Sequence, residues 1–137
     1  MYFNELKVGM KLNLSPAVIE KQKMLDFAYS YDNIPLHTDE EYAKTTPFGK
    51  LIAPGVMSFM SVWAKYLEVD FFKEGLLAGK STKIEWFKPV FAGVATITKL
   101  TPRNEKNGIA EVTIEVYNQD KILVLSSVTE AIVKIKT

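Results

Sequence analysis

The 137-residue sequence contains no cysteine, a single histidine, His37, and a single arginine, Arg103. Without cysteine the chain can form no disulfide, thiolate nucleophile or zinc–thiolate site, and we expect a cytoplasmic location. The lysines are scattered along the chain, so the clustered basic face typical of nucleic-acid-binding proteins is missing. We therefore expect no nucleic-acid partner, although lysines remain available to meet the phosphates of a small ligand.

Long hydrophobic runs are also missing. The longest run without a charged residue, 51–64, contains Pro54 and two serines and is too short to span a bilayer. The first seven residues carry both acidic and basic side chains, which is unlike the apolar core of a signal peptide. We expect no insertion into a membrane.

The composition is that of a folded protein with a hydrophobic core. Apolar residues make up 47% of the chain and charged residues 24%, with 17 basic and 16 acidic side chains giving a net charge of +1. These fractions exclude a disordered chain. The length suits one domain over residues 1–137.

Apolar residues at helical spacing predict three helices in the first half of the chain. The first covers residues 17–31, with Ser15-Pro16 as its start signal and Pro35 beyond its end. A short second helix is indicated by the acidic residues that open 39–43. The third, 56–67, is apolar at nearly every position, so we expect burial on most sides.

The second half of the chain is rich in strand-like runs. These cover residues 83–87, 94–100, 109–117 and 122–136. Turn-forming residues at 107–108 and 118–120 separate the later runs, which favours antiparallel hairpins and meanders. The prediction is an α+β domain in which an antiparallel sheet wraps around a long buried central helix.

Asp32 and His37 are the first candidates for chemistry. They flank a turn fixed by Pro35, and a carboxylate with an imidazole is the pair that general acid–base catalysis needs. Loops on a rigid scaffold often carry function. Alternatively, a lone histidine is simply structural or exposed.

Gly55 is the second candidate. Pro54 has no N–H, so Gly55 offers the first backbone donor at the start of the apolar helix. A helix N-terminus favours a carbonyl oxygen that becomes anionic, and glycine lets a ligand approach closely. Alternatively, the pair is a plain turn before a helix. We interpret the bulky Phe59, Trp63 and Trp86 as core residues rather than walls of an acyl pocket.

Taken together, these segments resemble the MaoC-like family of hot-dog-fold dehydratases and (R)-specific enoyl-CoA hydratases. The family motif reads Asp-x-Asn-Pro-x-His-x-Asp, followed by an Ile-Ala-His-Gly or Ile-Ala-Ser-Gly stretch and a Pro-Val-x-x-Gly turn. The resemblance covers nearly the whole chain, and the matching positions are Asp32, Pro35, His37, Asp39, Gly55, Pro89, Val90 and Gly93.

Three positions depart from the family pattern. Ile34 replaces the motif asparagine, and Pro54 replaces the histidine or serine before the glycine. Trp63 stands where a serine of the best-known hydratases supports the aspartate; Ser58 and Ser61 are nearby but are predicted to face elsewhere. These departures keep a non-catalytic acyl-thioester-binding or partner subunit open as an alternative. An acyl-CoA thioesterase on the same fold is a further one.

The resemblance implies reversible addition of water to an enoyl thioester. Asp32 and His37 would activate the water, and the Gly55 N–H would bind the thioester oxygen. No metal or redox cofactor is implied, because coenzyme A or a pantetheine arm of a carrier protein is part of the substrate. The fold further implies a homodimer or a multiple of dimers, since edge pairing covers an exposed strand.

Overall fold

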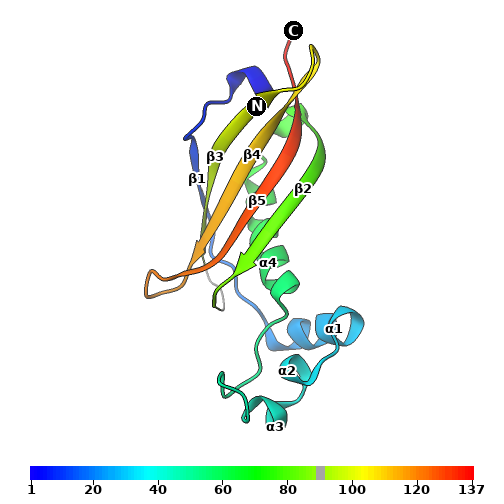
Figure 1. The fold of residues 1–137 in the computed structure, drawn as a ribbon, viewed down its shortest axis with the longest axis vertical. Coiled ribbons are helices and arrows are strands. Elements are labelled where there is room, and N and C mark those ends of the chain that lie inside the picture. The colour runs from blue at the N-terminus through cyan, green and yellow to red at the C-terminus, as the bar shows by residue number, and fades with distance from the viewer. Residues whose placement is uncertain (89–91) are drawn as a thin grey trace.

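The computed structural model describes residues 1–88 and 92–137. Its centre is a five-stranded antiparallel sheet in the order β1-β3-β4-β5-β2, with one long helix, α4 (Gly55–Val69), along one face (Figure 1). The strands are β1 (Lys11–Leu14), β2 (Leu76–Trp86), β3 (Ala92–Pro102), β4 (Asn107–Tyr117) and β5 (Leu123–Lys134). The predicted α+β class is confirmed.

Strands β3, β4 and β5 form a meander, as the turn residues predicted. The turn at 118–120 is held by Asn118, whose side-chain oxygen accepts from the N–H groups of Asp120 and Ile122. Asn107 and Gly108 differ from the prediction because they already lie in β4. There the turn is made by the preceding residues, with the Asn104 N–H bonded to the Asn107 carbonyl.

Alternate residues of the meander point toward α4 and form the core. On β4 the buried positions include Val112, Ile114 and Val116, each at most 1% exposed. Phe59 and Val62 of α4 belong to the same buried cluster. Burying each such side chain stabilises the fold by roughly 1.5–3 kcal/mol, so this contact holds α4 against the sheet.

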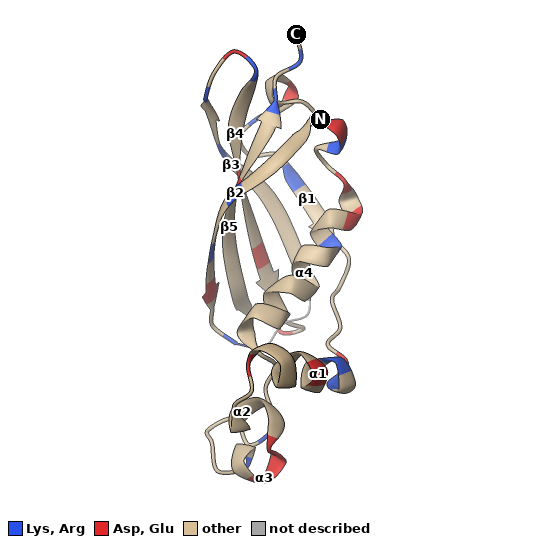
Figure 2. Ribbon diagram, turned by 90° about the vertical axis from the view of Figure 1, so that its right-hand side faces the viewer, with Lys and Arg blue, Asp and Glu red and all other residues tan. Residues whose placement is uncertain are grey.

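The outward face of α4 differs from the prediction of burial on most sides. Val56, Met60 and Leu67 are about half exposed, at 50%, 47% and 50%. The first ten residues of the helix carry no charge, and Figure 2 shows this end as tan ribbon next to the smaller helices. Within a single chain the sheet covers one side of α4 only.

Three smaller helices form a lobe beyond one end of the sheet (Figure 1). They are α1 (Lys21–Tyr31), α2 (Pro35–Thr38) and α3 (Glu40–Ala43). The short acidic helix was predicted, and the Asp39 carboxylate caps it by accepting from the Tyr42 N–H. The predicted start of the first helix at residue 17 is wrong, because Ala17 is buried in the sheet core and residues 15–20 form neither helix nor strand.

Two further differences concern the strands. β1 was not predicted, and β2 begins at Leu76 rather than residue 83. Nearly every residue of β2 is exposed, so it lacks the alternation that identifies a half-buried strand. The expected turn at Pro89 and Val90 lies outside the described residues. No helix among those described is long and apolar enough to cross a membrane.

Candidate active site

The end of α1 and the start of α2 bring Asp32 and His37 together. Asp32 terminates α1, where its N–H donates to the Ala28 carbonyl at 2.9 Å. Pro35 disfavours continuation of the helix at Ile34 and occupies the first turn of α2. His37 thus lies on a one-turn helix rather than in an open turn, and its ring folds back toward Asp32.

The imidazole of His37 is held from both sides. Its Nδ1 lies 2.7 Å from the carbonyl oxygen of Ile52, and its Nε2 lies 3.2 Å from Oδ2 of Asp32. A carbonyl oxygen can only accept, so Nδ1 carries a proton and the other nitrogen faces the carboxylate. At this separation one proton shared between Nε2 and Oδ2 satisfies both atoms, so the pair is arranged for proton transfer.

The two members of the pair differ in exposure. The His37 side chain is buried, with 7% of its surface exposed, whereas the Asp32 side chain is 39% exposed. The ring is therefore rigid and the carboxylate can be reached from the adjoining cavity. A fixed imidazole beside an accessible carboxylate is the arrangement that a positioned acid–base pair requires.

Gly55 begins α4, as predicted. Its N–H has no hydrogen-bond partner among residues 1–88 and 92–137, which leaves a donor at the positive end of the helix dipole. Pro54 precedes it as a buried residue and provides no side-chain cap. The Trp86 indole lies directly against this glycine and donates to its carbonyl oxygen at 2.7 Å.

One cavity of about 470 Å³ joins all of these groups. Its wall is otherwise largely apolar, apart from one exposed lysine, Lys88. The lining residues are Asp32, His37, Phe48, Ile52, Ala53, Gly55, Val56, Ser58, Trp86, Phe87 and Lys88. An apolar cavity with a few convergent polar groups is the usual form of a small-molecule site.

The sequence analysis assigned two residues of this wall to other surroundings. Ser58 was expected to face elsewhere, but it lines the cavity with its buried hydroxyl donating to the Pro54 carbonyl at 3.3 Å. Trp86 was expected in the core, but it is 47% exposed and lines the cavity. Ser58 could have been found from its position three residues after Gly55, one turn along the same helix face.

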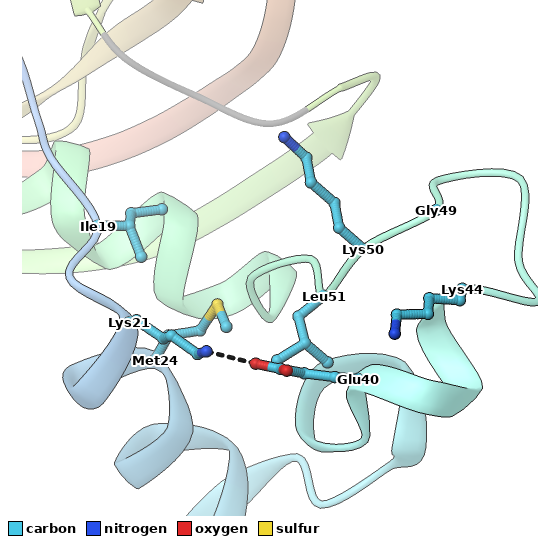
Figure 3. Close-up of a pocket in the computed structure, with 8 residues that line it drawn as sticks. All are labelled: Ile19, Lys21, Met24, Glu40, Lys44, Gly49, Lys50 and Leu51. Carbon is cyan, nitrogen blue, oxygen red and sulfur yellow. Dashed lines mark hydrogen bonds and ion pairs between the residues drawn. The ribbon is translucent and has the colours of Figure 1, made fainter.

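A second cavity of about 350 Å³ is lined by residues of the lobe and of the segment 49–51 (Figure 3). Lys21 of α1 hydrogen bonds to Glu40 of α3 there and lowers the pKa of that carboxyl. Lys44 pairs with Glu41 at 2.9 Å, while Lys50 points away from the Lys21–Glu40 pair (Figure 3). The ion pairs neutralise much of this cavity's positive charge and tie the lobe helices together.

The described residues also include no group of three or more potential ligand side chains placed to hold a metal ion. The polar groups of the cavity of about 470 Å³ are Asp32, His37, Ser58, Lys88, the Trp86 indole and the N-terminus of α4.

An antiparallel sheet packed on one long helix is the arrangement of the hot-dog fold, and here the Asp32–His37 pair and Gly55 share one cavity at the end of that helix. The sequence matches the MaoC like domain family over residues 4–122, and the chain belongs to this family. The position of the match includes all three residues singled out above, Asp32, His37 and Gly55.

Solved structures show the same fold. A protein from Archaeoglobus described as a monoamine oxidase regulatory protein is 29% identical, with a TM-score of 0.93, over 100% of this chain and 96% of its own. The (R)-hydratase from A. caviae involved in PHA biosynthesis is 28% identical, with a TM-score of 0.71, over 96% of this chain and 98% of its own. The predicted hot-dog fold is confirmed.

One curated relative matches a shorter stretch. The (R)-specific enoyl-CoA hydratase of Rhodospirillum rubrum is 37% identical over 57 residues, which is 42% of this chain and 40% of that protein. The family and these relatives place the chain among the MaoC-like hydratases and dehydratases in general terms.

Proposed function

We propose that the protein is an (R)-specific enoyl-CoA hydratase or MaoC-like acyl dehydratase, which adds water reversibly to a trans-2-enoyl thioester. The observation that carries this proposal is the His37 ring, fixed by the Ile52 carbonyl and directed at Asp32 in a cavity that also contains Gly55. The substrate's own coenzyme A or pantetheine arm is the only carrier group that the reaction requires.

In the hydration direction, Asp32 and His37 hold a water molecule and remove one of its protons. The water oxygen bonds to C3 of the enoyl group, and the C2–C3 π electrons move toward the thioester oxygen. The Gly55 N–H stabilises this enolate oxygen, and the dyad returns a proton to C2. Acid–base assistance of this kind supplies about 10²–10⁴-fold and one oxyanion donor about 10²–10³-fold.

Two structural features bear on the family residues that are missing here. Ile34 stands in place of the motif asparagine, and its side chain is 44% exposed. His37 nevertheless has its own anchor, because the Ile52 carbonyl fixes the ring. Trp63 replaces the supporting serine and packs on its own helix against Phe59 and Tyr66. The dyad is thus oriented by the backbone, which favours an active enzyme over a non-catalytic binding subunit.

The test is an assay of the hydration of crotonyl-CoA and longer enoyl-CoAs. The loss of the enoyl absorbance measures the rate, and chiral analysis identifies the product. Asp32→Asn and His37→Ala should each lower the rate by about 10²–10⁴-fold. Asp26→Asn is the matched control, because it alters an exposed carboxylate of α1 outside the cavity. A wild-type protein that hydrates none of these substrates contradicts the proposal. Release of free thiol would identify a thioesterase instead. Binding of the substrate without turnover would identify a non-catalytic binding subunit.

We also propose that the protein forms a homodimer or a multiple of dimers. Strand β2 is an edge strand of eleven residues, and nearly all of them are exposed. Proteins generally cover edges of this length, because an open edge recruits other strands. The apolar outward face of α4 adds to this surface, since Val56, Met60 and Leu67 follow one another on one side of the helix.

A further inference from the structure

The contact between Trp86 and Gly55 is unusually close. A Cβ atom at position 55 would lie 2.8 Å from Cε2, 3.0 Å from Nε1 and 3.2 Å from Cδ2 of the indole. The backbone of Gly55 is helical, a conformation that any residue adopts, so glycine is not required there for its φ angle. The indole's position therefore explains why residue 55 has no side chain.

The indole also forms a hydrogen bond with the first turn of α4. Its Nε1–H donates to the Gly55 carbonyl at 2.7 Å, and a carbonyl oxygen has a second lone pair left for the helix. Pro54 provides no side-chain cap, so this first turn lacks the usual restraint of an N-cap hydroxyl or carboxylate. Trp86, the last residue of β2, is the side chain that ties the helix start to the sheet.

We infer that Trp86 is a positioning residue that holds the Gly55 N–H at the place where the thioester oxygen gains charge. This inference rests on the proposed function. The His37–Ile52 bond ties the acid–base pair to the segment just before α4, and Trp86 ties the first residue of α4 to the sheet. A donor that moves by about 1 Å can lose about 10²-fold in rate, because oxyanion stabilisation depends on its geometry.

Kinetics of Trp86→Phe separate positioning from substrate contact. Phenylalanine keeps an aromatic ring against Gly55 but has no N–H for the Gly55 carbonyl. We expect kcat for crotonyl-CoA to fall about tenfold while KM stays within about twofold, because the lost restraint acts on the transition state. Trp63→Phe is the control, since Trp63 stacks with Phe59 and Tyr66 and is not in the cavity wall; its kcat should stay within about twofold.

A double-mutant cycle measured by thermal unfolding tests the contact without depending on enzyme activity. Gly55→Ala should lower the Tm of the wild-type protein, because the new Cβ displaces the indole. In the Trp86→Ala background the same change should leave the Tm unchanged or raise it, since alanine favours a helix over glycine. An equal loss in both backgrounds contradicts the role of the indole at Gly55.

The two proposals fail in different ways. An inactive wild-type protein contradicts the proposed reaction, and the catalytic role of Trp86 with it, while the thermal cycle still reports on the contact. An active wild-type protein whose Trp86→Phe variant keeps its kcat, or only raises KM, contradicts the positioning role alone.

Discussion

The Nδ1–H of His37 donates to the backbone carbonyl of Ile52 at 2.7 Å, and Ile52 lies fifteen residues further along the chain. This bond and the Asp32 carboxylate act on opposite sides of one ring. The two nitrogens therefore have separate tasks, one in holding the ring and one in proton transfer.

Two substitutions at His37 should separate these tasks. Asparagine places an amide N–H near the position of Nδ1 and has nothing at Nε2, whereas alanine has neither. Both variants should lose hydration of crotonyl-CoA by about 10²–10⁴-fold. Only His37→Ala leaves the partly buried Ile52 carbonyl unpaired, which should cost about 1 kcal/mol of unfolding free energy relative to His37→Asn. Urea titrations of the two variants measure this difference, and equal stabilities would contradict the anchoring role of Ile52.

Lys88, an exposed residue of the cavity wall, should recognise the phosphates of coenzyme A. Lys88→Glu should raise KM for crotonyl-CoA about fivefold, the effect of about 1 kcal/mol at an exposed charge, with kcat unchanged. The N-acetylcysteamine thioester of crotonate has no phosphate, so its KM should stay the same. Lys23→Glu on α1 is the control, because this exposed lysine lies outside the cavity wall. Equal effects on the two thioesters would rule out a phosphate contact.

The apolar outward face of α4 should mediate association. Sedimentation equilibrium of the wild-type protein should give twice the chain mass of 15.5 kDa, or a multiple of that. Met60→Glu should shift the protein toward monomer, because a charge at the centre of an apolar contact is costly to desolvate. Val18→Glu, at a residue that is 75% exposed and belongs to neither α4 nor β2, should leave the mass unchanged. A wild-type monomer would contradict the proposed dimer.

Tyr66 should make the protein less stable in alkali. Burial of its side chain raises the pKa of the Tyr66 hydroxyl above its ordinary value of 10.0. The unfolded chain therefore releases this proton first, so the free energy of unfolding should fall by up to ~1.4 kcal/mol per pH unit above about pH 10. Tyr66→Phe should flatten this decline in urea titrations, whereas Tyr31→Phe, at an exposed hydroxyl, is the matched control. An unchanged slope in Tyr66→Phe would contradict the effect.

The elements that are buried on one face were predictable from periodicity. β4 alternates between buried and half-buried residues, and its predicted bounds are within two residues of those observed. β2 was only half predicted, since its exposed residues lack that alternation. The prediction placed α4 correctly but overstated its burial within the chain. Apolar residues also form surfaces that bind another protein, so an apolar helix need not be buried on most sides.

The site was predictable where side chains carry the chemistry and not where the backbone does. Asp32, His37 and Gly55 could be found because a proline and a helix start constrain the chain around them. The Ile52 carbonyl has no signature, since every residue type has the same carbonyl. The Trp86 contact joins residues 31 positions apart, a distance over which local pattern carries no information.

The lobe has a hydrophobic interior of its own. Its buried residues, Met24, Ala28, His37 and Ala43, are separate from the cluster under the sheet, and its helices pack mainly on one another. A segment with so little buried surface opens at a lower free energy than the sheet. On gentle warming the lobe should open while the sheet is still folded, which separates Asp32 and His37 from the Gly55 N–H. Activity should then fall below the melting temperature, and amide hydrogen exchange in α1 and α2 should become faster at the same point.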